Sequence, residues 1–164
     1  MPVETVMEDA GVPGPGEYVG DCTEGITRVE QLPQAVIVRH SRNYPNRPCP
    51  KCGRSSYRLK TDERRLHDLG DSNSGRPREL VVFHSQHRCL GCNCYFNADM
   101  TDLAPPKAKY THRVMDLAVR TVVHYGLPYG LATEQLWFEH RVFVPAATIQ
   151  NWVEAAGEKG ARPN

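Results

Sequence analysis

Two short stretches decide the fold of this chain, Cys49-Pro50-Lys51-Cys52-Gly53 and Cys89-Leu90-Gly91-Cys92. Each places two cysteines on one tight turn with two residues between them, and Gly53 permits the backbone bend that aims amides at the sulfurs. Four thiolates suit the tetrahedral geometry of zinc, so we predict a zinc site made of Cys49, Cys52, Cys89 and Cys92. Four protein ligands leave no open coordination position, which indicates a structural metal and not a catalytic one.

One alternative concerns the second pair of ligands. Cys89 could pair with Cys94 at a spacing of four residues, so that Cys94 replaces Cys92. We prefer Cys92, because it repeats the spacing of the first pair. His84 and His87 are near enough in the sequence to substitute for a cysteine, although a histidine in a strand is more often a surface or supporting residue.

The segments around the cysteines predict a small β structure. Residues 35–38 form a short β-branched run that is typical of a strand, and residues 57–60 and 80–83 are further strand candidates. The 36 residues between Cys52 and Cys89 are many for a compact ribbon, so we expect residues 61–78 to form an insertion or an extended hairpin. Residues 35–104 are therefore predicted to form a β ribbon clamped by zinc, with a long hairpin between the two cysteine pairs.

Beyond Pro105-Pro106 the apolar residues follow a helical period. A stripe from Val114 to Tyr125 predicts a first helix that ends at Gly126, and residues 129–139 predict a second. A third is expected to begin at Pro145, because proline is tolerated in the first turn. The side chains expected to be buried on the last two helices are Leu131, either Gln135 or Leu136, Phe138, Ile149, Trp152, Val153 and Ala156, with Trp137 also in the core.

These elements predict an α+β protein in which a helix-turn-helix of three helices, residues 105–157, follows the ribbon. Residues 158–164 are expected to form a tail. The first 34 residues are acidic and rich in Gly and Pro, so we expect a disordered acidic tail over 1–34, with Cys22 as a free thiol.

Composition excludes several classes of protein. The chain has 164 residues, of which 24% are charged, and its mean hydropathy of −0.54 suits a soluble protein of one domain or two small ones. No stretch approaches the roughly 20 apolar residues that span a bilayer. The first residues lack the basic and apolar regions of a signal peptide. We therefore expect a cytoplasmic protein without a membrane partner, whose cysteines bind metal and do not form disulfides.

Charge is distributed unevenly along the chain. Residues 1–38 carry a net charge of −6, residues 39–65 carry +7, and residues 66–164 are neutral. A dense basic block is typical of a phosphate-binding surface, although a solvated face would have the same composition. Lys51 and Arg54 are expected to compensate the −2 charge of a zinc with four thiolates.

Four motifs in order resemble a known family. They are Cys-Pro-x-Cys-Gly at 49–53, Arg-Cys-x-x-Cys-x-x-x-Phe at 88–96, Gly-Leu-x-Tyr at 126–129 and Thr-Ile-x-x-Trp-Val at 148–153. Together they cover about residues 45–157 and resemble the N-terminal zinc ribbon and helix-turn-helix of bacterial insertion-sequence transposases of the DDE type. The chain departs from that pattern at Pro145, where a Ser or Thr helix cap is usual, at Pro128, where Ser is usual, and at Cys94, where a basic residue is usual.

The resemblance implies that the ribbon and the helices bind the terminal inverted repeats of a mobile element. In that family a downstream RNase-H-like domain with three carboxylates and divalent metal cuts and joins the DNA. This chain ends after the helix-turn-helix, so we expect no enzymatic activity. A catalytic transposase domain or a second copy of the chain is a further partner that the resemblance implies.

The residues expected to contact DNA fall into two groups. The third helix has no Lys or Arg over residues 145–156, so its exposed Gln150 and Asn151 are expected to read bases, as amides can bind adenine bidentately. They could equally be ordinary exposed residues. Phosphate contacts are expected from Arg58, Lys60, Arg64, Arg65, Lys107, Lys109, His112, Arg113 and Arg141.

The sequence thus predicts a zinc-stabilised module of a truncated or fragmentary transposase that binds double-stranded DNA at the element ends. The alternative is a zinc-ribbon adaptor for protein interactions or a transcriptional regulator, which the lack of positive charge on the third helix favours. A metallo-hydrolase would need an open zinc position, which four cysteines do not leave.

Overall fold

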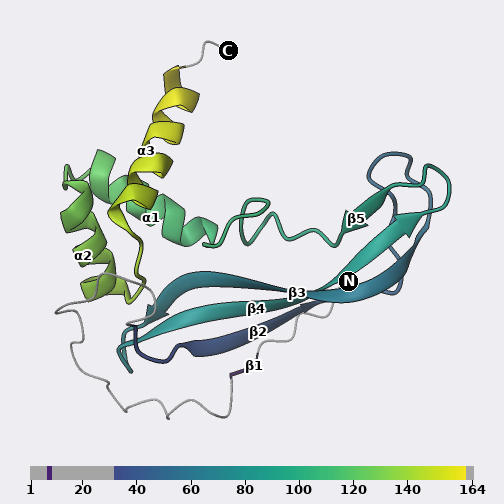
Figure 1. Cartoon of the computed structure of the whole chain (residues 1–164), viewed down its shortest axis with the longest axis horizontal. Helices are drawn as coiled ribbons and strands as arrows, with labels where there is room; N and C mark the ends of the chain where they lie inside the picture. Colours follow the sequence, from purple (N-terminus) through teal and green to yellow (C-terminus); the bar gives the residue numbers. More distant parts are fainter. Residues whose placement is uncertain (1–6, 9–31, 162–164) are drawn as a thin grey trace.

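The computed structural model describes residues 7–8 and 32–161, and it is an α+β protein in which a sheet is followed by three helices (Figure 1). Its strands are β1 (Met7–Glu8), β2 (Val36–Arg42), β3 (Ser56–Asp71), β4 (Arg76–Cys89) and β5 (Tyr95–Asn97). Its helices are α1 (His112–Val123), α2 (Tyr129–His140) and α3 (Ala146–Ala161). The predicted α+β class is confirmed.

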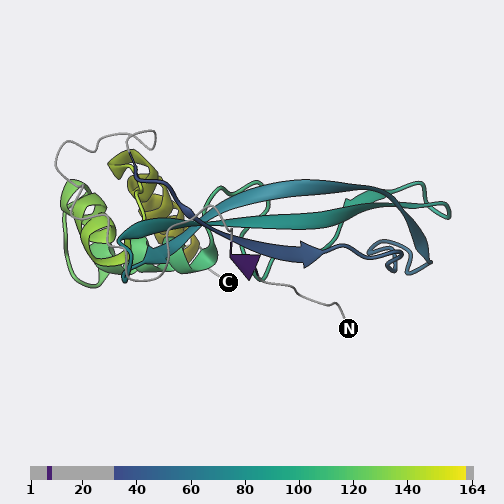
Figure 2. The ribbon, with the colours of Figure 1, turned by 90° about the horizontal axis from the view of Figure 1, so that it is seen from below.

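A long antiparallel hairpin of β3 and β4 forms the main body of the sheet. The pairing runs from Ser56 opposite Cys89 to Asp71 opposite Arg76, with register shifts near each end. Gly75, with φ of +74°, helps to close the turn. Figure 2 shows this hairpin as a twisted arm with the helices at one end. The long hairpin expected between the two cysteine pairs is therefore present.

β2 lies parallel to β4, a pairing that the sequence did not predict. The order of strands is β1-β2-β4-β3, and β5 pairs with β4 beyond the end of β2. After Arg42 the chain crosses one face of β4, where the Tyr44 N–H donates to Ser85 Oγ at 3.1 Å. It then reaches the outer edge of β3, where the carbonyl of Arg47 accepts a backbone hydrogen bond. Beneath the crossing segment, Ser85 and His87 are fully buried.

The tails differ in part from the sequence prediction. Most of the expected acidic tail, with Cys22, lies outside the described residues. Met7–Glu8 forms β1 and pairs with Val38 and Arg39, because the outer edge of β2 offers unpaired backbone groups. At the other end α3 continues to Ala161, through most of the segment expected to be a tail.

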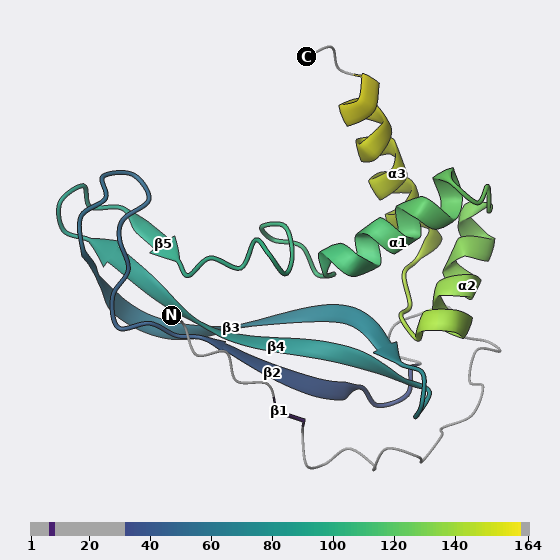
Figure 3. The same ribbon diagram turned by 180° about the vertical axis from the view of Figure 1, so that it is seen from behind.

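The segment between β5 and α1, residues 98–111, runs back along one face of the hairpin (Figure 3). Met100 and Ala104 pack there on Leu66, Leu80 and Val82, in a core between this segment and the sheet. Burial of these side chains removes apolar surface from water and fixes the path of the segment. The helices are thereby held near the turn of the hairpin.

The three helices share a second core. Its buried members are Tyr110, Val114, Ala118, Ala132, Leu136, Val142, Val144 and Ile149. The Tyr110 ring meets Trp152 edge to face, with centroids 5.2 Å apart. Gly126 ends α1 with φ of +74°, as predicted. The predicted helices therefore all form, with α3 longer than expected.

The prediction of which side chains α2 buries was partly wrong. Leu136 and Trp137 are buried, but Leu131 and Phe138 are 50% and 48% exposed. The helix packs through Ala132 and Leu136, four residues apart, and Leu131 and Phe138 lie away from that face. The sequence reasoning favoured large side chains over the small Ala132. On α3, Ala156 is likewise exposed.

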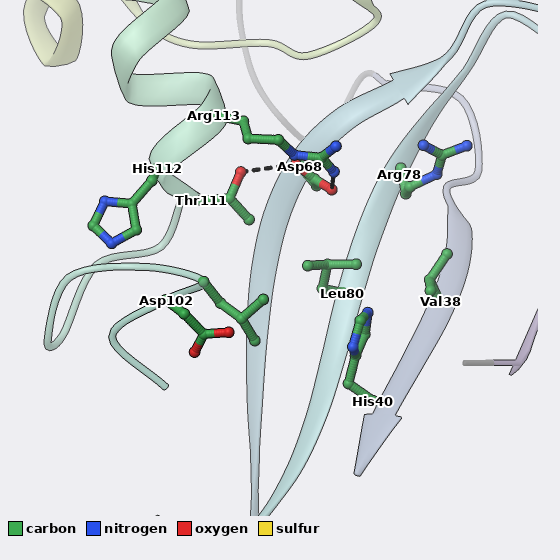
Figure 4. Close-up of a pocket in the computed structure, with 10 residues that line it drawn as sticks. Val38, His40, Asp68, Arg78, Leu80, Asp102, Thr111, His112 and Arg113 are labelled. Carbon is green, nitrogen blue, oxygen red and sulfur yellow. Dashed lines mark hydrogen bonds and ion pairs between the residues drawn. The ribbon is translucent and has the colours of Figure 1, made fainter. Parts of the chain in front are cut away.

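The helices are joined to the hairpin near the end of β3. The His67 N–H donates to the Lys109 carbonyl at 2.8 Å, and the Thr111 N–H donates to the His67 carbonyl at 3.0 Å. Asp68 is buried and accepts a 2.8 Å hydrogen bond from the Thr111 hydroxyl and another from the Arg113 guanidinium. Figure 4 shows both side chains pointing at this carboxylate. A buried carboxylate with two donors thus fixes the first turn of α1 on the sheet.

Gly70 forms a second contact of this junction. A Cβ on Gly70 would lie 2.5 Å from both Cβ and the carbonyl oxygen of Arg141, which follows α2. We expect Gly70→Ala to force the helices away from β3 and to lower the free energy of unfolding by about 1–3 kcal/mol. Urea denaturation followed by circular dichroism measures this loss.

Gly157→Ala is the matched control, because nothing lies within 4 Å of a Cβ at this position in α3. It should raise the free energy of unfolding by up to about 0.5–1 kcal/mol, since alanine favours a helix. Equal stability of the Gly70 variant and the unchanged protein would contradict the close contact.

Candidate metal centre

The four cysteines predicted as ligands meet at the end of the hairpin where β3 begins and β4 ends. Their sulfur atoms all lie within 4.8 Å of one another. Cys49 and Cys92 are 3.5 Å apart, and Cys52 and Cys89 are 3.4 Å apart. Sulfurs about 2.3 Å from a tetrahedral zinc lie about 3.8 Å from one another. The cluster therefore has the dimensions of a site that could hold a metal ion.

The two cysteine turns have the same backbone geometry. The Cys49 N–H donates to the Arg54 carbonyl at 2.8 Å, and the Cys89 N–H donates to the Cys94 carbonyl at 2.9 Å. The residue after each second cysteine is left-handed, Gly53 with φ of +75° and Asn93 with φ of +61°. Glycine and asparagine adopt this conformation most readily. The repeated turn explains why Cys92, and not Cys94, completes the cluster.

The same turns shift the acidity of the thiols. The backbone N–H of Cys52 is the main cause that lowers the pKa of Cys49 to about 6. The hydrogen bond with Cys49 raises the pKa of Cys92 to about 12. The directions are opposite because ionising one thiol of a close pair makes ionising the other harder. A bound divalent cation removes this conflict by favouring all the thiolates.

The other candidate ligands lie outside the cluster. The Cys94 thiol donates to the carbonyl of Tyr95 at 3.6 Å. His87 shares a 2.7 Å hydrogen bond with Ser85 Oγ, and burial lowers the pKa of both His84 and His87. The donor set is thus four sulfurs, which suits a soft metal such as zinc or iron.

A strongly basic surface surrounds the cysteines. The two segments that meet here, residues 43–61 and 80–98, contain no Asp or Glu. We call this region the cationic end. Its basic residues are Arg47, Lys51, Arg54, Arg58, Lys60 and Arg88. The −2 charge of a metal with four thiolates would leave this region positive.

Of the predicted DNA-contacting residues, only Arg58 and Lys60 belong to the cationic end. Both are exposed on β3. Arg58 donates to Asn43 Oδ1 at 2.8 Å, and Lys60 Nζ lies 3.9 Å from Asp62. Such exposed contacts are weak and leave both side chains available to a phosphate.

The structure assigns other partners to four of the predicted residues. Arg64 donates to the carbonyls of Pro105 and Ala108, which ties residues 98–111 to β3. Arg65 pairs with Glu63 at 2.8 Å and Glu79 at 3.6 Å.

Arg113 binds the buried Asp68. Arg141 is 5% exposed, with its guanidinium 5.0 Å from the centroid of the Trp137 ring. Neither guanidinium belongs to the cationic end.

The remaining predicted residues lie apart from the cationic end, and all of them are exposed except the half-buried His112. Lys107 and Lys109 lie between β5 and α1, and Gln150 and Asn151 lie on α3. Gln150 donates to Glu154 at 3.0 Å. His112 shares a 2.6 Å hydrogen bond with the Thr101 carbonyl.

Sequence reasoning counted Arg47 in the basic block of residues 39–65 but did not name it as a phosphate contact, and it missed Arg88 as a member of the basic surface. Arg47 lies over the ring of Tyr44, 4.3 Å from its centroid, and Arg88 lies on β4. The signal that could have found them is the absence of carboxylates from both segments, which the net charge of longer windows conceals.

No family model, curated protein or solved structure matches this chain. The resemblance to transposases therefore rests on the sequence motifs alone. Within the described part of the chain, no helix has both the length and the apolar character needed to span a membrane. The cysteine cluster and the cationic end are accordingly the features of the structure that bear on function.

We expect Cys52→Ser to abolish stoichiometric binding of Co²⁺, because it leaves three thiolates. Titration with Co²⁺, followed by the sulfur-to-metal charge-transfer absorption, measures both stoichiometry and the number of thiolates bound. Cys94→Ser is the control, since Cys94 lies beside the cluster but outside it. Equal loss of Co²⁺ binding in both variants would contradict the assigned ligand set.

Proposed function

We propose that this chain is a zinc-stabilised DNA-binding module without enzymatic activity. The observation that carries the proposal is the cationic end, where basic side chains gather around the cysteine cluster and no carboxylate occurs in the two segments. Duplex DNA carries one negative charge per about 1.7 Å of its axis, so a dense positive surface attracts it strongly. Arginine also binds phosphate oxygens bidentately.

Zinc at the four cysteines would have a mechanical role in this binding. It would tie the turn that carries Lys51 and Arg54 to the turn that follows Arg88. Fixing these side chains before DNA arrives lowers the conformational entropy lost on binding. With four protein ligands the metal has no place for a substrate, which supports a structural role.

The helices are proposed to form a helix-turn-helix, as the transposase resemblance implies. Ile149 is buried in the core while Gln150 and Asn151 are exposed on α3, so this helix could present amides to base edges. The residues that contact phosphates and the residues that contact bases would then lie at opposite ends of the molecule. Duplex from the ends of a mobile element is the proposed target.

A double variant of Arg58→Ala and Lys60→Ala tests the proposal. We expect weaker binding to all duplex sequences, and the slope of log K against log salt should become shallower by about two, one for each lost phosphate contact. Fluorescence anisotropy of a labelled duplex over a range of salt concentrations measures both quantities. The zinc-loaded full chain is used throughout.

Arg65→Ala is the matched control, because Arg65 is also exposed on β3 but pairs with two glutamates. It should leave affinity and salt slope nearly unchanged. Failure of the unaltered protein to retain duplex even at low salt would reject the proposal.

The three helices also favour a second function, that of an adaptor for protein partners. Leu131 and Phe138 are exposed on α2 and line a shallow hollow with Leu127. Its other lining residues are Glu134, Gln135, Glu139 and Arg141. Exposed apolar side chains beside two glutamates suit a partner segment that has both apolar and basic residues.

This adaptor function predicts that Phe138→Ser abolishes capture of a stoichiometric partner in nuclease-treated extract, because it removes the ring from the hollow. Tyr125→Ser, at another exposed aromatic residue, should leave capture unchanged. Pull-down followed by mass spectrometry measures this, and the absence of any stoichiometric partner would exclude the adaptor function.

A further inference from the structure

One face of the sheet at the cationic end carries a row of three side chains across three strands. Tyr57 of β3 lies opposite Arg88 of β4, and Arg88 lies opposite Tyr95 of β5. Residues opposite one another in neighbouring strands point to the same face. Tyr57 is 37% and Tyr95 55% exposed. The row therefore presents two aromatic rings to solvent on either side of a guanidinium.

The row is held in place by its own contacts. The Arg88 guanidinium lies 5.3 Å from the centroid of the Tyr95 ring and donates two hydrogen bonds to Asn93 Oδ1. Asn93 is the left-handed residue of the second cysteine turn. The orientation of Arg88 thus depends on the turn that completes the metal cluster, and a metal there would stiffen the row.

The rest of this face is covered, which makes the open row distinctive. Leu80, Val82 and His84 alternate along β4 with Arg88, so they point to the same side. Residues 98–111 cover that side at Leu80 and Val82. Beyond the covered residues, Tyr57 and Tyr95 are exposed at the end of the hairpin that carries the cysteine cluster.

The charge around the row indicates what it binds. Lys60 lies opposite Gln86, which is two residues before Arg88 and on the same face. No carboxylate occurs in residues 43–61 or 80–98, and the nearest one along β3, Asp62, lies on the side of Lys60 away from Tyr57, so the surface around Tyr57 and Arg88 is positive. Exposed aromatic rings within a positive surface are the features with which proteins bind unpaired nucleotides: the rings stack on bases and the cations contact phosphates.

We propose that Tyr57, Arg88 and Tyr95 form a stacking surface for the bases of single-stranded DNA. In a duplex each base already stacks on its neighbours, so the rings can add affinity only where bases are unpaired. The inference rests on the proposed function, because the same cationic end supplies the phosphate contacts. It adds that the module recognises an unpaired segment as well as duplex.

Tyr57→Leu and Tyr95→Leu test the surface, since leucine keeps an apolar side chain but removes the ring. The probe is oligothymidylate of about 12 nucleotides, a length within the usual site size of such surfaces. We expect each variant to weaken binding of this strand by about tenfold and to bind a duplex of the same length as the unaltered protein does. Tyr95→Phe should retain the affinity, because the ring remains.

Tyr125→Leu is the matched control, because Tyr125 is 67% exposed but lies after α1, in the helical part. This variant should change neither the affinity for oligothymidylate nor the affinity for the duplex. Retained Co²⁺ absorption in every variant shows that the cysteine cluster is intact. Fluorescence anisotropy with labelled strands measures all the affinities.

Other outcomes overturn the inference in distinguishable ways. Duplex binding without binding of oligothymidylate would reject the stacking surface and leave the proposed function standing. Binding of neither probe would reject both. Unchanged affinity of the Tyr57→Leu and Tyr95→Leu variants for oligothymidylate would reject stacking, because the strand would then be bound through charge alone. Oligouridylate bound more than tenfold more tightly than oligothymidylate would assign the surface to RNA.

Discussion

The antiparallel pairing of β3 with β4 underlies both the cysteine cluster and the attachment of the helices. It places Ser56 opposite Cys89, which brings two cysteine turns separated by more than thirty residues to the same end of the hairpin. A slip of one residue would reverse the face of every side chain on one strand. Leu66 and Leu80, which lie opposite each other, would then no longer both face Met100 and Ala104, and the core that holds residues 98–111 on the sheet would be disrupted.

Basic residues of this chain have two different physical roles. Arg64 and Arg113 bind acceptors supplied by a neighbouring segment, and each thereby holds one element to another. The exposed residues of the cationic end, such as Arg58, have no carboxylate within their own segments. The electrostatic field outside the molecule arises mainly from charges that, like these, have no opposite charge beside them. The distinction explains why a basic block in the sequence is larger than the basic surface it produces.

The elements with a local signal were predicted well. The cysteine spacing and the apolar period that ends at Gly126 both concern residues within a few positions of one another, and both predictions agree with the structure. Predictions that depended on which other element a helix or strand packs against were less accurate. Leu131 and Phe138 are apolar residues on a helix, yet the face that packs is chosen by where α1 and α3 lie. No pattern within β2 indicates that it pairs in parallel with β4.

The α+β class, the cysteine cluster and the three helices could be predicted from the sequence alone, because turn geometry and helical periodicity act over short distances. Only the tertiary structure decided which basic residues remain on the surface. Arg64 and Arg58 are six positions apart on one strand, but only Arg64 meets the carbonyls of residues 105 and 108. Likewise the row of Tyr57, Arg88 and Tyr95 exists only through strand register, which brings together residues far apart in the chain.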